Sequence, residues 1–256
     1  MKSAHSTRMR KLLSSTVSAV SSVAIAASPM VSSRVAYADS LPTGGQVTDG
    51  NATISNPSAQ NLSINQTTDK AVIDWNSFSI GAGNQVNFYV PNSNSATLNR
   101  VNGSTTSTIA GQMQSNGQLF LINPNGILIT PTGSVNTNAF IASSLNMTNA
   151  DFMSGKNRFR GNGSSADVVN QGLIETQDGG VAVLMGGHVE NSGTIISNEG
   201  AVGLASGEDI TLDLTGDGLL SVTVPTSNAN QTRALVSQTG RIKASGGRVE
   251  LKAATT

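Results

Sequence analysis

NQGLIETQDGGVAV (residues 170–183) recurs 21 residues later as NSGTIISNEGAVGL (191–204) and once more as QTGRIKASGGRVEL (238–251). If the first residue of each copy is position zero, all three copies have glycine at positions 2 and 9, isoleucine at position 4 and valine at position 11. Position 13 is valine or leucine. A spacing of about 21 residues is typical of one coil in a stacked repeat protein.

The spacing of apolar residues within each copy favours two short strands. Positions 2 and 4, and then 9, 11 and 13, alternate with the two-residue period of a strand, and glycine marks the turn between them. We therefore expect an all-β fold in which coils stack as a β-solenoid, with Ile, Val and Leu aligned in internal columns. Asn170 and Asn191, each at the start of a copy, are expected to form a side-chain amide ladder. A β-sandwich of evenly spaced hairpins is the alternative.

Other parts of the chain extend or interrupt this pattern. Placed over the chain from Pro124, the template also finds Gly126, Leu128, Gly133 and Val135. Residues 146–169 break the pattern and are expected to form a short helix or an excursion from the stack. Residues 39–54 have the turn residues and short strands suited to the N-terminal cap that a solenoid needs. The last coil ends near Leu251 without such a cap, from which we expect the chain to be the first part of a longer protein.

The composition limits the class of protein. Only 12% of the 256 residues are charged, about half the ~25% typical of soluble domains. Polarity comes instead from Asn, Ser, Thr and Gln, which suits a β-rich chain with many turns better than a disordered one. Because the chain has no basic cluster, nucleic acid is not expected as a partner. It has no cysteine and only two histidines, so no metal or cofactor is expected either.

The N-terminal residues differ from the rest of the chain. Residues 1–38 contain five basic residues and no acid, whereas the remainder carries 10 basic and 15 acidic residues. A serine-rich apolar stretch follows the basic start, and small residues flank Tyr37. This pattern predicts a secretory signal peptide over residues 1–38, cleaved between Ala38 and Asp39 after use of the general secretion machinery. The remaining residues, 39–256, are expected to form one domain.

Five blocks of sequence carry a family resemblance. They are LPTGGQVTDGNATI (41–54), AVIDWNSFSIGAGNQVNF (71–88), ATLNRVNG (96–103), SNGQLFLINPNGILI (115–129) and VNTNAFIASSLNMTNADFMSG (135–155). Together they resemble the N-terminal domain of two-partner-secreted bacterial exoproteins, the filamentous haemagglutinin and high-molecular-weight adhesin family. One departure is Ala139, where relatives often end a second Asn-x-Asn element in glycine.

The resemblance implies a fold, a function and a location. The fold is a right-handed parallel β-helix with an N-terminal cap and small extra-helical elements, and it performs no catalysis. Such a domain is recognised in the periplasm by an outer-membrane β-barrel transporter that carries periplasmic recognition domains. The chain then crosses the Gram-negative outer membrane unfolded and folds at the cell surface.

The block FLINPNGILI places the turn Asn123-Pro124-Asn125-Gly126 between two strand-like runs. Turn chemistry suits every residue, because Asn caps the first position, Pro presets φ at the second, and Asn and Gly tolerate the remaining conformations. The resemblance implies a second role, in which this turn, together with Asn136 and Asn138, helps to present the segment that the transporter recognises.

Two other functions stay open. The chain could be a stand-alone secreted adhesin whose solenoid face binds a host or neighbouring-cell surface. It could also be a β-helix glycan-cleaving enzyme, which would need paired carboxylates. Glu208 with Asp209, and Asp213 with Asp217, are the densest acids. The second pair is expected to form a turn rather than a calcium loop, since repeated ligand spacing is missing.

Four further residues have ordinary structural interpretations. His188 is the one candidate catalytic base outside the leader, and we expect it at a coil corner instead. Trp75 is expected to pack inside the early coils, with a receptor contact as the alternative. Arg100 and Arg158 are expected to bond to nearby acids or carbonyl groups.

Overall fold

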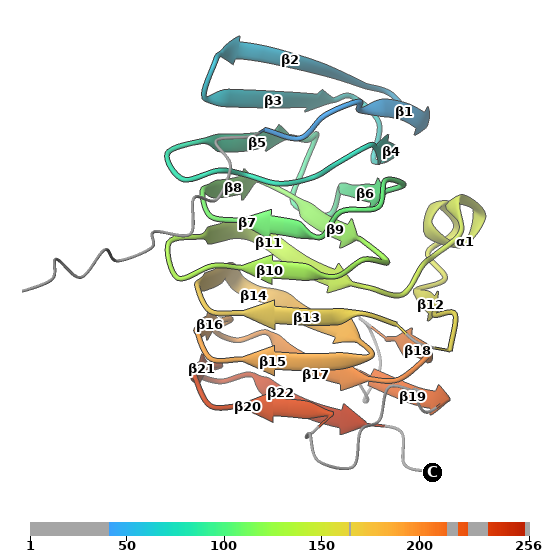
Figure 1. Ribbon diagram of the computed structural model, residues 1–256, viewed down its shortest axis with the longest axis vertical. Helices are drawn as coiled ribbons and strands as arrows, with labels where there is room; N and C mark the ends of the chain where they lie inside the picture. Colours follow the sequence, from blue (N-terminus) through green and yellow to red (C-terminus); the bar gives the residue numbers. More distant parts are fainter. Residues whose placement is uncertain (1–40, 164, 214–219, 225–234, 254–256) are drawn as a thin grey trace, which may run out of the picture. The chain divides into compact units, whose positions relative to one another are not determined.

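Each coil of the chain places strands on up to three faces, and the strands of one face pair in parallel with those of the next coil (Figure 1). The computed structural model describes residues 41–163, 165–213, 220–224 and 235–253. The leader and its expected cleavage between Ala38 and Asp39 lie outside these residues. Among the described residues, no helix is long and apolar enough to cross a membrane.

The three faces are defined by their strands. Face A consists of β3 (Asn61–Gln66), β5 (Gln85–Tyr89), β8 (Gln112–Ser115), the first halves of β11 (Ser134–Ser143) and β14 (Leu173–Gly186), β16 (Thr194–Ile196) and β21 (Arg241–Lys243). Face B consists of β4 (Lys70–Trp75), β6 (Ala96–Val101), β9 (Gln118–Ile122), the second halves of β11 and β14, β17 (Ala201–Ser206) and β22 (Arg248–Ala253). Face C consists of β7 (Ser107–Ile109), β10 (Ile127–Ile129), β13 (Asp167–Asn170), β15 (His188–Asn191) and β20 (Val236–Gln238).

The expected parallel β-helix is confirmed by these pairings. Val135 aligns with Ile174, Ile174 with Ile195, and Ile195 with Ile242, so position 4 of the repeat forms a column that runs through successive coils. The first three of these side chains have no exposed surface. Stacking therefore buries an apolar face that no single coil could bury alone.

The sequence template was wrong in the second strand of its first copy. Leu173 pairs with Thr194, 21 residues later, but Val181 pairs with Ala201, only 20 residues later. The turn in the first copy therefore holds one extra residue, and such a slip moves every following side chain to the opposite face of the strand. The inward column contains Ala182 and Leu184, aligned with Val202 and Leu204, and does not contain Val181 and Val183.

The overlay from Pro124 was also wrong in its phase. Val135 aligns with Ile174, which is position 4, whereas the overlay had put Val135 at position 11. In each copy of the repeat, glycine is followed two residues later by an apolar residue both at positions 2 and 4 and at positions 9 and 11. The overlay from Pro124 therefore aligned Val135 with the second strand of the repeat instead of the first.

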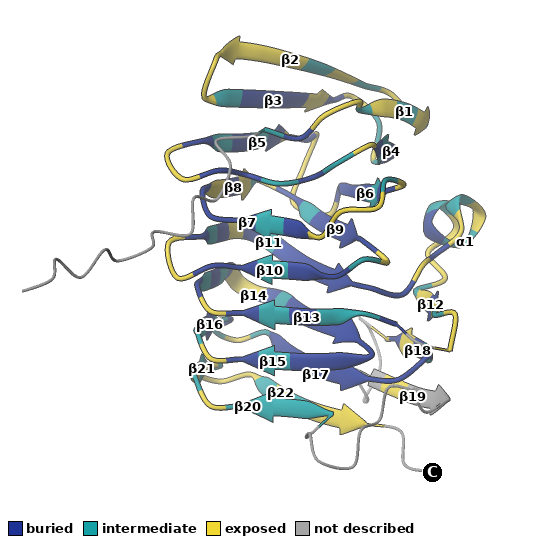
Figure 2. Cartoon of the chain, viewed as in Figure 1, coloured by how far each residue is buried: buried dark blue, intermediate teal, exposed yellow. Residues whose placement is uncertain are grey.

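Face B is buried on both sides from β4 to β17, whereas β22 is mostly exposed (Figure 2). Its inner side chains join the core of the coils, and its outer side chains form a second cluster with Phe152 and Phe159. These two aromatic residues lie on α1 (Asn149–Ser154) and β12 (Arg158–Arg160), within the excursion that the sequence predicted. β12 pairs with β18 (Asp209–Leu212), which pairs with β19 (Leu220–Val224). Burial on both sides explains the unbroken apolar runs in face B strands.

The first coil is closed by antiparallel strands, as expected for a cap. β1 (Gln46–Asp49) pairs with β4, and β2 (Ala52–Ser58) pairs with β3. Trp75 packs beneath this cap with 2% of its surface exposed, in an edge-to-face contact with Phe78 at 5.4 Å. Its indole N–H donates to Asn99 Oδ1 at 3.1 Å. The packing role is confirmed, since so buried a ring cannot touch a receptor in the folded chain.

The predicted amide ladder lies at the end of face C. Asn170 Nδ2 donates to Asn191 Oδ1 at 2.7 Å, and Asn191 Nδ2 donates to Gln238 Oε1 at 2.8 Å. Both asparagines are fully buried, so each carboxamide satisfies the polar group of its neighbour.

Candidate functional site

The Asn123-Pro124-Asn125-Gly126 segment forms the corner between β9 on face B and β10 on face C. The Gly126 amide donates to the Asn123 carbonyl at 2.9 Å, which closes a four-residue β-turn. Gly126 has φ of +98°, a conformation that favours glycine. Pro124 is exposed and Asn125 is half-buried. The turn predicted from the sequence is confirmed.

The side chain of Asn123 holds the neighbouring loop as well as the turn. It has no exposed surface, and its Nδ2 donates to Thr105 O and to Ser107 Oγ, both at 2.9 Å. Its Oδ1 accepts from the backbone N–H of Asn125 at 2.9 Å and from Asn125 Nδ2 at 3.1 Å. Asn125 Nδ2 also donates to Gly103 O at 2.7 Å. The turn therefore fixes residues 103–107 of the preceding coil, a role that turn chemistry alone did not predict.

Asn136 and Asn138 lie in the first half of β11, whereas the Asn123 turn lies near its last residue. The Asn123 N–H donates to Ser143 O at the last residue of β11, and Asn136 precedes Ser143 by seven residues on the same strand. At ~3.3 Å per residue, the two elements are separated by roughly 20 Å of chain along β11, which also turns from face A to face B between them. The residues that the sequence grouped as one recognition element are thus separated, with one pair at the B–C corner and the other on face A.

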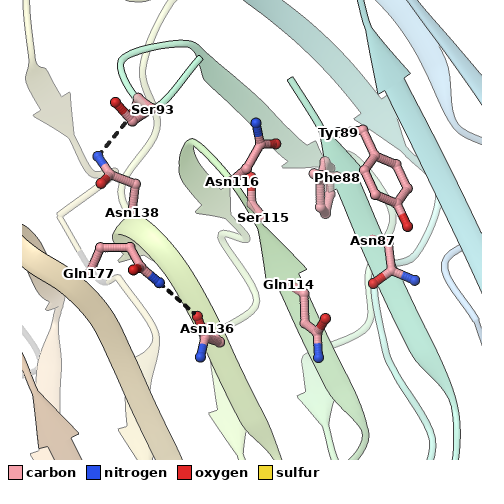
Figure 3. A pocket seen from close by; sticks show the side chains of 10 residues that line it. All are labelled: Asn87, Phe88, Tyr89, Ser93, Gln114, Ser115, Asn116, Asn136, Asn138 and Gln177. Atoms are coloured by element: carbon pink, nitrogen blue, oxygen red, sulfur yellow. Dashed lines mark hydrogen bonds between the residues drawn. The ribbon is translucent and has the colours of Figure 1, made fainter. Parts of the chain in front are cut away.

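Asn136 and Asn138 line a groove of about 540 Å³ on the outside of face A (Figure 3). Asn138 Nδ2 donates to Ser93 O at 2.9 Å, and Gln177 Nε2 contacts Asn136 Oδ1 at 3.4 Å. Other side chains of the groove come from β5 and β8, namely Asn87, Tyr89, Gln114 and Ser115. This groove was not predicted from the sequence. The signal was present in QVNFY, QMQS and SVNTN, where polar amides recur with a period of two in successive face A strands.

Glu208 and Asp209, two of the four acids considered for catalysis, have structural partners. The Glu208 carboxylate is buried and accepts from the backbone N–H of Gly163 at 3.1 Å and of Ser165 at 2.8 Å. It also accepts from Ser165 Oγ at 2.6 Å. Asp209 bonds instead to arginine, so the two adjacent acids do not form a pair. Asp213 is exposed, and Asp217 lies outside the described residues.

His188 lies in β15 and is buried, with Nδ1 3.7 Å from Asp167 Oδ2. It therefore belongs to a face C strand, where a coil corner had been expected. In the described part of the chain, no group of three or more His, Asp or Glu side chains is arranged to hold a metal ion.

Arg100 and Arg158 contact acids or carbonyl groups, as expected, and these contacts join the excursion to the rest of the fold. Arg100 lies 2.8 Å from Asp74 Oδ1, and it donates to Met147 O at 3.2 Å and to Asn149 Oδ1 at 2.8 Å. Arg158 Nε donates to Asp209 Oδ1 at 2.9 Å. This hydrogen bond lowers the pKa of Asp209 below its usual value and raises that of Arg158.

Comparison with known proteins gives consistent matches over most of the chain. A family model described as the TPS secretion domain matches residues 38–256. A heme/hemopexin-binding protein of Haemophilus influenzae (strain Rd) is 34% identical over 223 residues, which are 82% of this chain and 23% of that protein. The crystal structure of the HMW1 secretion domain from Haemophilus influenzae is also similar, with a TM-score of 0.72 and 35% identity. That match covers 83% of this chain and 56% of the other.

Proposed function

The chain belongs to the TPS secretion domain family, and from this premise we propose that it directs an exoprotein to a partner transporter in the outer membrane. The observation that carries the proposal is the match over residues 38–256, which includes the NPNG corner and both asparagines of β11. The similar proteins are a secretion domain and a heme/hemopexin-binding protein. Glu208 and Asp209, the first pair of acids considered for the glycan-cleaving alternative, are bonded to Ser165 and Arg158 and do not form a catalytic pair.

The route that we propose has three steps. The leader takes the chain to the periplasm, where the recognition domains of the transporter bind residues 115–155. The transporter β-barrel then passes the unfolded chain to the cell surface. There the β-helix adds coils one at a time on its N-terminal cap, because a solenoid can grow from one end. Each coil that forms outside opposes backward sliding of the chain.

The burial of Asn123 is consistent with recognition of the chain by the transporter before folding. A fully buried side chain cannot contact a transporter after folding, but it is accessible before folding. An extended segment can also add as a strand to the sheet edge of a recognition domain. We therefore assign recognition to Asn123, Pro124, Asn125 and Gly126, together with Asn136 and Asn138, in the chain that has not yet folded.

The test compares export of two variants that each lose buried side-chain hydrogen bonds. The first is Asn123→Ala combined with Asn125→Ala. The second is Asn191→Ala, which removes a buried carboxamide with two strong hydrogen bonds outside residues 115–155. Secretion is measured by surface labelling in cells with and without the transporter, and stability is measured on the purified chains. We expect the first variant to lose most export and Asn191→Ala to retain it.

Two outcomes contradict the proposal at different levels. If export of both variants falls in proportion to their stability, residues 123–126 act only as a corner. If the parent chain is exported equally well without the transporter, the secretion function itself is wrong. Deletion of residues 115–155 should abolish transporter-dependent export.

A further inference from the structure

The outer side of face A carries carboxamide side chains in register across neighbouring strands. Asn87 of β5 pairs with Gln114 of β8, and Gln114 pairs with Asn136 of β11. Two residues earlier along β5 and β8, Gln85 pairs with Gln112. Figure 3 shows Asn87, Gln114 and Asn136 side by side on the same surface. Three consecutive coils therefore present the same functional group at the same height.

These carboxamides retain unused hydrogen-bonding capacity. Each has two N–H donors and an oxygen with two lone pairs. Asn87 accepts one bond, from Gln85 Nε2 at 2.8 Å. Gln114 Nε2 contacts Gln112 Oε1 at 3.5 Å. Asn136 contacts Gln177 Nε2 at 3.4 Å and Glu175 Oε2 at 3.5 Å. All three distances are at the limit of a hydrogen bond. Donors and acceptors on this surface are thus available to a ligand.

An exposed aromatic ring lies beside the carboxamides. Tyr89, at the end of β5, has 56% of its surface exposed, whereas most large apolar side chains of the described residues are buried. It lines the same groove of about 540 Å³ as Asn87, Gln114 and Asn136. The ten residues that line this groove include no charged side chain. A flat apolar ring therefore stands next to a row of neutral donors and acceptors.

The chemistry of this surface selects among ligands. Phosphate-bearing ligands need Lys or Arg, which the groove lacks. Lipids and amphipathic helices need a broad apolar surface, and Tyr89 is the only exposed ring among the lining residues. Sugar hydroxyls both donate and accept, as carboxamides do, and the C–H face of a pyranose can pack on an aromatic ring. Neighbouring strands are ~4.8 Å apart, which is close to the length of one pyranose unit. The side chains of each coil can therefore contact one sugar ring.

We propose that the folded domain binds a neutral oligosaccharide along this groove, with its sugars running across β5, β8 and β11. Tyr89 packs against one ring, and Asn87 and Gln114 hydrogen-bond to hydroxyl groups. This function goes beyond export and belongs to the chain after it has folded. All three residues lie outside residues 115–155, so loss of glycan binding and loss of export can be measured separately.

The experiment titrates the purified, folded chain with maltohexaose, cellohexaose and chitohexaose, and with hexagalacturonate as an anionic comparison. Binding is measured by isothermal titration calorimetry. We expect at least one neutral hexasaccharide to bind with Kd of about 0.1–1 mM. Tyr89→Ala should raise Kd about tenfold, and Tyr89→Phe, which keeps the ring, should change it little. Gln114→Ala should weaken binding several-fold. Gln171→Ala, an exposed carboxamide outside the groove, is the matched control and should bind like the parent.

Thermal melts of each variant establish that it is folded before titration. Absence of saturable binding of every neutral hexasaccharide up to about 10 mM would overturn the proposal. Binding that survives both Tyr89→Ala and Gln114→Ala would place the ligand elsewhere and would also overturn it. Tighter binding of hexagalacturonate would contradict the neutral class. A dimer that Tyr89→Ala disrupts, in a chain that binds no sugar, would assign this surface to a second copy.

Discussion

Replacing Asn123 by alanine removes four side-chain hydrogen bonds, two that hold the B–C corner to the preceding coil and two within the turn itself. Ser107 Oγ, which is fully buried, loses a partner, and an unsatisfied buried group costs ~1–3 kcal/mol. The Thr105 carbonyl and the Asn125 N–H are closer to water, and each bond there contributes about 0.5–1 kcal/mol. The total is about 3 kcal/mol of unfolding free energy, which for a chain of this size lowers Tm by roughly 6–12 °C.

The assay is thermal and urea unfolding of the purified chain, followed by circular dichroism. Neighbouring variants provide an internal scale. Asn125→Ala loses the 2.7 Å bond to Gly103 O and should cost about 1 kcal/mol, because this residue is half-buried. Pro124 is exposed, so Pro124→Ala should leave a folded domain with a change below about 1 kcal/mol. If Asn123→Ala melts within about 1 °C of the parent, or if Pro124→Ala is the most damaging of the three, the hydrogen-bond argument is wrong.

The remaining predictions concern other parts of the stack. Gly193→Ala should prevent stable stacking in purified protein, because a Cβ there would lie 2.3 Å from the backbone carbonyl oxygen of Gly172. A Cβ at Gly83 would have no atom within 4 Å, so Gly83→Ala should cost only the strain of its positive φ. Phe159→Ala should lower the unfolding free energy by about 3–5 kcal/mol, since the fully buried ring covers face B; urea titration measures it. The lowered pKa of Asp209 means that its bond to Arg158 contributes stability above the unfolded pKa near 4 and loses it as pH falls through the folded value. Asp209→Asn should therefore melt slightly below the parent at pH 7, and the difference in Tm should shrink as the pH is lowered below about 4.

The sequence predicted the stacked coils because the repeat places isoleucine where every coil needs an inward side chain. It failed for Val181 and Val183, because one extra residue in a turn reverses the faces of a strand. Such an insertion leaves the spacing of apolar residues intact, since face B is apolar on both sides. The pattern of apolar residues therefore did not reveal the extra residue in the turn.

The candidate site was predicted only in part. The turn at residues 123–126 follows from local chemistry, but the bonds from Asn123 to residues 105 and 107 join segments of different coils. Local rules cannot predict such pairs. The groove on face A was missed for a related reason. Asn87, Gln114 and Asn136 look like ordinary outward polar residues until parallel pairing sets them side by side.

The burial of Asn123 links recognition to folding in a way that exposed residues could not. If the transporter binds this side chain in the unfolded chain, the folded corner and the transporter compete for the same carboxamide. A partner that binds only the unfolded chain, at 100 times its Kd, shifts the equilibrium by ~2.7 kcal/mol, comparable to the ~3 kcal/mol that the Asn123 bonds contribute. Transporter binding would then delay closure of this coil in the periplasm. Folding of this coil at the cell surface would bury the Asn123 side chain, which could then no longer bind the transporter. Folding itself would therefore release the chain.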